Sequence, residues 1–333
     1  MGDDDDAATI HRMASLATPM TLRVAVTLGL PDRLLGDGAA VERLAPELDV
    51  SPVALELLLN HLTTLGMVER TATGYRTTPL GTHLCADARD GFTANLLHLD
   101  RAGGRAELAF VELAHSIATG EAAYPRRYGR DFWADLAAHP HLRESFDRQM
   151  TQRLRDQVPR LVAGIDWARF ATVVDVGGGN GTLLAAVLAA HPGMTGHLVE
   201  LEPSAAEAER AFRAGGLVER ARVTAGSFFD PLPAGAQAYL LCDVLHNWDD
   251  DGAGRILGRC AEAADPTSRV LVVEAVGGRR ADTGMDLAML AIFGGRERGV
   301  DEFRALAGDR GLVLDAVTDL TERRCLLEFR PAG

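Results

Sequence analysis

Three glycines spaced G-x-G-x-G, Gly177, Gly179 and Gly181, follow the apolar run at residues 173–176 and open a helix-like segment. Because glycine carries no side chain, backbone N–H groups at such a turn can approach a polar ligand, and the following helix N-terminus favours a nucleotide-like cofactor. A dinucleotide fingerprint needs another glycine three positions after Gly179, where this chain has Thr182. The spacing therefore favours the adenosine part of S-adenosylmethionine (SAM) over NAD.

Two further segments carry residues suited to a nucleoside. Glu200 ends an apolar run 21 positions after Gly179, where a carboxylate can accept hydrogen bonds from both ribose hydroxyls. The alternatives are a surface glutamate at this position and Glu202 as the ribose ligand. Ser227 and Phe228 follow the next apolar run and can offer a hydrogen bond and a packing surface to adenine. The alternative for this pair is a loop with buried phenylalanines.

His246 follows the apolar run at residues 238–243. An imidazole with an unperturbed pKa of roughly 6.5 suits a general base near neutral pH. Asp249 and Asp250 come next and are expected to cap the following helix. A metal site is not expected there, because no third carboxylate or histidine lies at a useful spacing.

Two glutamates lie where partners of such a base are expected. Glu274 ends another apolar run, and Glu297 lies in a glycine-bent turn after a helix-like segment. We expect one to hold the imidazole tautomer and the other to stabilise the charge that develops on the ring. The alternative for Glu297 is a salt bridge to Arg296 or Arg298. His246, Glu274 and Glu297 together are therefore the candidate catalytic residues.

From residue 170 onward, strand-like and helix-like segments alternate, which predicts an α/β fold with a doubly wound, mainly parallel, Rossmann-like sheet of seven strands. The expected strands are residues 172–176, 197–201, 220–225, 238–243, 269–275, 312–317 and 324–329. The expected helices between them are residues 182–190, 204–214, 249–264 and 300–309. In such sheets ligands bind beyond the carboxyl ends of the strands.

The first 150 residues are predicted to be mostly helical. Apolar residues recur at helix-like spacing over residues 8–30, Ser51-Pro52 is expected to begin a helix, and short extended pieces lie at 67–70 and 75–78. Helices followed by a hairpin outline a winged helix, used for dimerisation and substrate capping or for DNA binding. We favour the former, because residues 54–65 contain no Arg or Lys to meet phosphates. The expected domains are 1–100 (dimerisation), 101–155 (helical connector at the substrate) and 156–333 (SAM-binding and catalytic).

Composition limits the function classes. The 333 residues are 47% hydrophobic and 24% charged, with a net charge of −13 that disfavours nucleic-acid binding. No stretch has the apolar length of a membrane span, and the acidic start of the chain is unlike a secretory leader. The four cysteines lie far apart, which fits neither a disulfide framework nor a zinc site. We expect a cytoplasmic protein without a membrane or nucleic-acid partner.

Nearly the whole chain resembles the SAM-dependent small-molecule O-methyltransferases, which include plant caffeate and flavonoid enzymes and bacterial antibiotic-pathway enzymes. The similarity is most specific at Val174-Asp-Val-Gly-Gly-Gly-Asn-Gly, Val244-Leu-His-Asn-Trp-Asp-Asp and Phe293-Gly-Gly-Arg-Glu-Arg. It implies SAM as cofactor without a metal, His246 as the base assisted by Glu274 and Glu297, and a homodimer formed through the N-terminal domain. We also assign Asp175 and Trp248, which lie in these motifs, to the cofactor site.

The resemblance places substrate-contacting methionines near Met150 and Met289. Together with nearby aromatic residues they are expected to bind a flat, phenol-bearing acceptor, although ordinary core packing is the alternative for each. The expected substrate residues are Phe132, Trp133, Phe146, Met150, Met289, Phe293 and Asn247.

Three positions depart from the family pattern. Asn247 stands where the family usually has Asp, Cys242 where plant members have a lysine near the cofactor, and Ser227 where they have an adenine-binding Asp. These differences indicate a bacterial type of cofactor site with fewer charges. The segments at 110–116 and 126–133 resemble enzymes of aromatic polyketide pathways, so methylation of an aromatic hydroxyl is the expected activity. The alternatives are non-methylating chemistry in a SAM-binding relative, an NAD-linked oxidoreductase and a winged-helix regulator.

Overall fold

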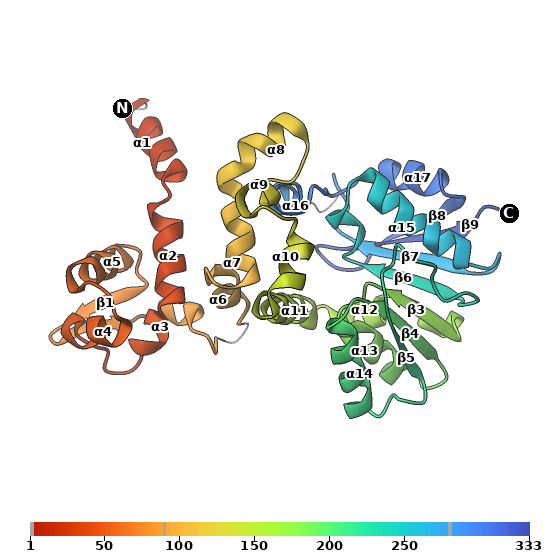
Figure 1. Cartoon of the computed structure of the whole chain (residues 1–333), viewed down its shortest axis with the longest axis horizontal. Helices are drawn as coiled ribbons and strands as arrows, with labels where there is room; N and C mark the ends of the chain where they lie inside the picture. The colour runs from red at the N-terminus through yellow and green to blue at the C-terminus, as the bar shows by residue number, and fades with distance from the viewer. Residues whose placement is uncertain (1–2, 89–90, 279–281) are drawn as a thin grey trace. The chain divides into compact units, whose positions relative to one another are not determined.

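The fold is taken from a computed structural model that describes residues 3–88, 91–278 and 282–333 (Figure 1). The chain divides into two compact units. The first unit holds the described residues up to Arg105 together with Pro140–Gln149, and the second holds Ala106–His139 and the described part of Met150–Gly333. Helix α11 (Pro140–Arg155) contributes residues to both units.

The first unit consists mainly of helices around a core that includes Leu30, Leu44, Leu59 and Tyr75. Its other elements are α1 (Asp3–Ala14), α2 (Ala17–Thr27), α3 (Leu30–Arg33), α4 (Val41–Leu48), α5 (Pro52–Thr64), η1 (Gly81–Leu84), α6 (Phe92–Leu97) and the start of α7 (Ala102–Glu107). An antiparallel hairpin of β1 (Val68–Thr71) and β2 (Gly74–Thr77) follows α5.

The helix-like spacing over residues 8–30 is divided between two helices. Pro19 lies at the third position of α2, has no N–H, and would clash with the carbonyl of Ser15 in a continuous helix. The Ser15 hydroxyl instead accepts a hydrogen bond from the Ala17 N–H, at 3.2 Å. The expected helix start at Ser51 is confirmed, because its hydroxyl accepts from the Ala54 N–H and Pro52 is the first helical residue.

The second unit contains a seven-stranded sheet, as predicted. Its strands are β3 (Thr172–Val176), β4 (Thr195–Glu200), β5 (Ala221–Ala225), β6 (Ala238–Cys242), β7 (Arg269–Glu274), β8 (Leu312–Asp319) and β9 (Cys325–Pro331). The strand order is β5-β4-β3-β6-β7-β9-β8, in which β9 runs in the direction opposite to the other six strands. The chain winds outward from β3 in one direction and from β6 in the other, so the switch point lies between these two strands.

Helices cover both faces of this sheet (Figure 1). Alternate residues of each central strand face opposite sides, so both faces need apolar side chains, which explains the nearly continuous apolar runs. On one face α15 (Asp250–Ala263) and α17 (Val300–Gly308) pack on residues such as Val176 and Leu241. On the other face α12 (Val158–Gly164), α13 (Thr182–Ala190) and α14 (Ser204–Ala214) pack on Leu240 and Leu271.

The remaining elements of the second unit are short helices before the sheet and two elements within it. They are η2 (Leu108–Glu112), α8 (Leu113–Thr119), α9 (Tyr124–Tyr128), α10 (Phe132–Ala138), η3 (Trp167–Arg169), η4 (Leu245–Asn247) and α16 (Thr283–Phe293). Among the described residues, none of the helices has the length and apolar character that crossing a membrane requires.

Candidate active site

The glycine turn lies directly after β3, at the switch point of the sheet. Gly177, Gly179 and Gly181 all have left-handed φ values, 74°, 60° and 76°, which glycine adopts without strain. A Cβ at Gly181 would lie 2.8 Å from a ring atom of Phe212, so the protein fills that side of the turn. A Cβ at Gly179 would meet no protein atom within 4 Å, so its backbone is open to a ligand.

Glu200 lies at the end of β4 beside this turn, as predicted. Its carboxylate accepts hydrogen bonds from the N–H groups of Gly179, at 2.9 Å, and Leu201, at 2.8 Å. The carboxylate is therefore fixed against the glycine turn by two backbone donors. The predicted ribose contact remains a prediction, but the residue lies where that contact requires it.

Asp175 lies within β3 under the glycine turn. It is 1% exposed, and neither carboxylate oxygen has a hydrogen-bond partner among the described residues. Burial, followed by the nearby charge of Glu200, raises the pKa of Asp175 to about 7. A buried carboxylate without a partner is costly, and a bound ligand that donates hydrogen bonds or carries a positive charge would remove that cost. The turn, Glu200 and Asp175 thus fit a cofactor such as SAM.

Phe228 and Cys242 border the same turn without charge. A Cβ at Gly177 would lie 3.2 Å from the Phe228 ring and 3.1 Å from Val244, so the loops after β5 and β6 both reach the glycine turn. Ser227 accepts a hydrogen bond from the Phe229 N–H at 3.1 Å. Burial raises the pKa of the Cys242 thiol well above its ordinary value, so this side chain is neutral.

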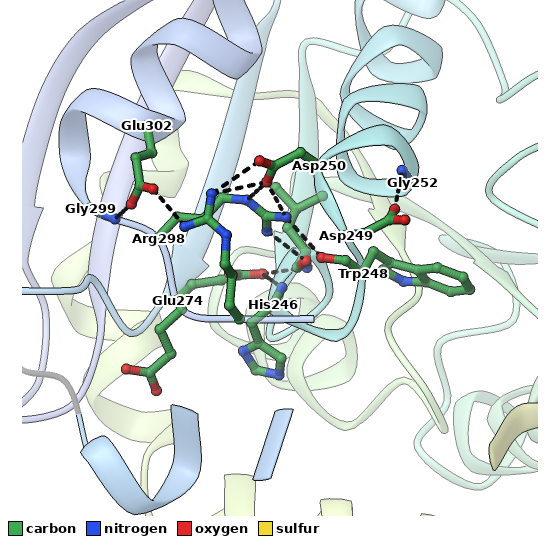
Figure 2. Close-up of polar contacts among 12 residues, drawn as sticks. His246, Trp248, Asp249, Asp250, Gly252, Glu274, Arg298, Gly299 and Glu302 are labelled. Carbon is green, nitrogen blue, oxygen red and sulfur yellow. Dashed lines mark hydrogen bonds and ion pairs between the residues drawn. The ribbon is translucent and has the colours of Figure 1, made fainter. Parts of the chain in front are cut away.

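His246 lies in η4, the short turn after β6, and Glu274 from β7 holds this turn by its backbone. One oxygen of Glu274 accepts hydrogen bonds from the N–H groups of Val244, at 3.0 Å, Leu245, and His246, at 3.3 Å. In Figure 2 the dashed lines reach the backbone of His246 but not its imidazole. No hydrogen bond joins Glu274 or Glu297 to the ring among the described residues, contrary to expectation, and Glu274 positions the backbone instead.

Arg298 holds the same turn through other backbone groups. Its guanidinium is 1% exposed and donates to the carbonyls of Leu245, at 3.0 Å, and Trp248, at 2.8 Å. Asp250 accepts from the same guanidinium at 2.9 Å and so neutralises it (Figure 2). Glu274 and Arg298 thus fix both the donors and the acceptors of the turn that carries His246.

Gly295 approaches this turn more closely than any side chain would allow. A Cβ there would overlap the carbonyl oxygen of His246 and lie 2.8 Å from the amide nitrogen of Trp248. The segment after α16 is therefore packed directly against the backbone of residues 246–248.

His246 is 5% exposed, and among the described residues its hydrogen bond to a side chain is made by the backbone N–H and not by the ring. Burial lowers the pKa of His246 to about 4, opposed by Asp243 and assisted by Arg153, Arg324 and Arg298. The ring is therefore neutral at physiological pH, and a neutral imidazole has a free lone pair to accept a proton.

Glu297 lies close to this site, and its carboxyl group has no salt bridge to either flanking arginine. Arg298 pairs with Asp250, and Arg296 pairs with Asp250 and Glu302. One oxygen of Glu297 is buried without a hydrogen-bond partner among the described residues. Burial, followed by the charges of Asp286 and Asp282, raises the pKa of Glu297 to about 7. The salt-bridge alternative is therefore wrong for the residues that the structure describes.

The two aspartates after Trp248 have different roles. Asp249 caps α15 as predicted, accepting a hydrogen bond from the Gly252 N–H at 2.8 Å (Figure 2). The expectation that Asp250 also caps the helix is wrong, because its carboxylate is bound by Arg296 and Arg298. In the described part of the chain, no group of three or more His, Cys, Asp or Glu side chains is arranged to hold a metal ion.

An array of aromatic rings in the second unit includes Trp248, two positions after His246. Trp248 stacks on Trp133, with ring centroids 6.3 Å apart, and Trp133 stacks on Phe293 at 5.3 Å. Phe132 contacts Phe293 edge to face at 5.0 Å, and Phe228 contacts Trp248 in the same way at 5.8 Å. The rings predicted to contact substrate therefore adjoin the rings predicted to contact the cofactor.

The other predicted substrate residues have mixed placements. Met289 is buried in α16. Met150 is partly buried in α11 and is the first residue of that helix to belong to the second unit. The Asn247 side chain donates to the carbonyl of Asp243 at 3.2 Å. Phe146 belongs to the first compact unit, so the structure does not place it relative to the others. Their contacts with substrate remain predictions.

An ion pair next to the base was not expected from the sequence. Asp243, directly after β6, has a left-handed φ of 55° and binds the buried Arg324, whose Nε donates at 2.9 Å. Burial alone would raise the pKa of Asp243, but Arg324 overrides it and lowers the pKa to about 2. Because the partners lie 81 positions apart, no local spacing indicates this pair.

Comparisons with known proteins agree with this site. Residues 110–313 match the family model for the O-methyltransferase domain, and residues 10–87 match the O-methyltransferase dimerisation domain. A 2,7-dihydroxy-5-methyl-1-naphthoate 7-O-methyltransferase from Streptomyces carzinostaticus is 46% identical, over 92% of this chain and 93% of the relative. Aclacinomycin 10-hydroxylase from Streptomyces purpurascens is 42% identical, over 94% and 86%.

Solved structures show the same relationship. An O-methyltransferase from neocarzinostatin biosynthesis, in complex with SAM and 2-hydroxy-5-methyl naphthoic acid, is 44% identical to this chain. The two superpose with a TM-score of 0.91 over 96% of this chain and 98% of that one.

Proposed function

The chain belongs to the O-methyltransferase family, and on that premise we propose that it methylates a hydroxyl group of a bicyclic or polycyclic aromatic acid. The enzyme is SAM-dependent, as its solved relative is. The observation that carries the proposal is a neutral, buried imidazole in the turn whose Val244 borders the glycine turn and whose Trp248 belongs to the aromatic array. Relatives that act on naphthoates support an acceptor of this class.

The residues of the second unit fit SAM. We assign the backbone of Gly177–Gly181 and the carboxylate of Glu200 to the nucleoside, with Phe228 packing on adenine. The buried carboxylate of Asp175 suits a ligand group that donates to it. When bound, SAM supplies a methyl group that its sulfonium centre makes strongly electrophilic.

His246 accepts the proton of the acceptor hydroxyl, at Nε2 in this proposal. The hydroxyl proton becomes far more acidic as the oxygen forms its new bond to carbon, so a base with a pKa of about 4 can still remove it. A general base contributes typically about 10²- to 10⁴-fold, whereas alignment of reactants can contribute about 7–11 kcal/mol. Positioning by Glu274, Arg298 and Gly295 is therefore as important as the basicity of the ring.

The hydroxylase relative raises a second activity. At 42% identity, aclacinomycin 10-hydroxylase shows that this fold is also found in proteins named for other chemistry. The presence of His246 at the strand end favours methylation, because transfer to a hydroxyl needs a proton acceptor. The NAD-linked alternative is disfavoured, because the solved relative binds SAM.

We further propose a homodimer. Residues 10–87 match a dimerisation domain, and within it three apolar side chains of α1 and the following turn, Ile10, Met13 and Leu16, are 66%, 82% and 65% exposed. Exposed apolar side chains that lie close together indicate a covered surface. Location in the cytoplasm remains a prediction from the sequence.

Incubation with methyl-labelled SAM tests the activity directly. With a panel of hydroxylated naphthoates, anthraquinones and quinones, we expect mass spectrometry to show one labelled methyl group on an acceptor oxygen, with S-adenosylhomocysteine formed in equal amount. Oxygen incorporation without methyl transfer would favour the hydroxylase alternative, and no reaction with any aromatic hydroxyl would contradict the proposal.

Glu297 should give the enzyme a pH dependence near neutrality. Because its pKa is raised to about 7, the carboxyl group is neutral below this pH and ionised above it. If the ionised form stabilises the imidazolium, kcat should rise as pH increases through about 7, and Glu297→Gln should stay at the low acid-side rate. Comparing the two pH profiles isolates Glu297 from Asp175, whose pKa is also about 7. A rise in kcat that persists in Glu297→Gln would refute this role.

A further inference from the structure

The end of α11 and the residues after it are tied to both sides of the site. Thr151 accepts a hydrogen bond from the side chain of Asn180, in the glycine turn, at 2.8 Å. Gln157 accepts one from Arg324, the partner of Asp243. All of these residues belong to the second unit, so the segment 151–157 is anchored between the cofactor turn and the turn of His246.

Arg153 lies in the middle of this anchored segment. It is partly buried, and its guanidinium makes no hydrogen bond or ion pair within the described residues, although its backbone carbonyl accepts a hydrogen bond from Gln157 at 3.5 Å. Its charge nevertheless acts on three groups of the site, lowering the pKa of Asp243, His246 and Glu297. These groups come from separate elements of the chain, and the segment that carries Arg153 is itself held at Thr151 by the glycine turn and at Gln157 by the partner of Asp243.

The carboxyl groups of the site near Arg153 are either paired with other arginines or partly protonated. Asp243 is held by Arg324, and Asp250 by Arg296 and Arg298. The raised pKa of Glu297, about 7, leaves that carboxyl group partly protonated at neutral pH. A partly buried guanidinium without a partner has lost part of its hydration, and an anion that joined it would restore favourable contacts.

We propose that Arg153 binds a carboxylate carried by the aromatic acceptor and thereby selects hydroxyaryl carboxylates over neutral phenols. This inference rests on the proposed function, since it names the anionic group of the same acceptor. The planar guanidinium matches a carboxylate with two parallel N–H···O bonds, so it would fix the ring orientation as well as increase affinity. Arg153 is in this view a specificity-determining residue, not a catalytic one.

The test compares an acid with its neutral analogue. Steady-state methylation of a hydroxynaphthoate and of its carboxamide is measured with wild type, Arg153→Met, Arg153→Lys and Arg155→Met. Hydrogen bonds to charged groups contribute about 1.5–3 kcal/mol, which corresponds to a loss of roughly 10- to 150-fold in kcat/KM. We expect Arg153→Met to lose this much with the acid, mainly through KM, and less than threefold with the carboxamide.

The other variants are controls. Arg155 is an exposed residue two positions along the same helix, and Arg155→Met removes the same charge at the surface, so it should behave as wild type. Arg153→Lys should recover part of the preference for the acid, because it keeps the charge without the planar fork. Equal losses with the acid and the carboxamide, or an equal effect of Arg155→Met, would overturn the proposal.

A binding measurement separates this inference from the proposed function. Affinity of the hydroxynaphthoate is measured by calorimetry in the presence of S-adenosylhomocysteine. Binding that weakens in Arg153→Met while wild type transfers no methyl group would support the anion site and refute the proposed activity. If wild type methylates the acid and Arg153→Met binds it with unchanged affinity, the proposed activity is supported and the anion site is refuted.

Discussion

His246→Ala should lose about 10²- to 10⁴-fold in kcat while its affinity for SAM stays within about twofold of wild type. The expected loss follows from removal of the only proton acceptor that the proposal places at the acceptor hydroxyl. SAM affinity should persist because the glycine turn and Glu200 make their hydrogen bonds without the imidazole. Single-turnover rates with methyl-labelled SAM, together with calorimetric titration of SAM, measure both quantities.

His197→Ala is the matched control for this variant. His197 lies on β4 of the same sheet, where its ring is hydrogen-bonded to Thr224 at 2.7 Å, away from the turn that carries the base. This variant should keep the wild-type kcat. A similar loss in both variants would indicate a general effect on the fold, and near wild-type turnover of His246→Ala would remove the base assignment.

Gly295→Ala should lower kcat about 10²-fold, although the substitution adds one methyl group and touches no proposed ligand. The new Cβ would overlap the carbonyl of His246, so the backbone of residues 246–248 must shift. A displacement of about 1 Å in a catalytic group can cost about 10²-fold in rate, and overpacking typically costs about 1–3 kcal/mol in stability. The measurements are kcat with saturating substrates and the free energy of unfolding in urea.

Gly193→Ala provides the comparison. Gly193 lies in the second unit, has no left-handed φ, and has open space at its Cβ position. We expect Gly193→Ala to retain both kcat and stability. If Gly295→Ala is folded and fully active, the close approach of its segment does not position the base.

The sheet and the candidate ligand residues were predictable because their signals are local. Strands buried on both faces require continuous apolar runs such as Val270–Val273, and a left-handed turn between strand and helix requires glycines such as Gly179 and Gly181. The position of His246 after the fourth of these runs follows from the same reasoning. Because β3 and β6 are neighbouring parallel strands, their carboxyl ends place the glycine turn and the turn of the base at the same edge of the sheet.

The contacts that fix the base were not predictable in the same way. Asp250 lies at a helix start and has the type of a capping residue, yet it binds Arg298, 48 positions later. Glu274 lies where a partner of the imidazole was expected, yet it binds three successive N–H groups of the turn. Such pairings depend on how distant segments pack, and neither the residue types nor their spacing in the sequence indicates them.

Acceptors of different acidity test the role of His246 most directly. A phenol that is already ionised at the assay pH needs no base, whereas a neutral phenol does. The ratio of kcat in wild type to kcat in His246→Ala is measured for a series of ring-substituted acceptors whose phenol pKa values lie on both sides of the assay pH. We expect this ratio to be large for weakly acidic phenols and to approach one for the most acidic. A ratio that stays constant across the series would show that His246 does not act as the proton acceptor.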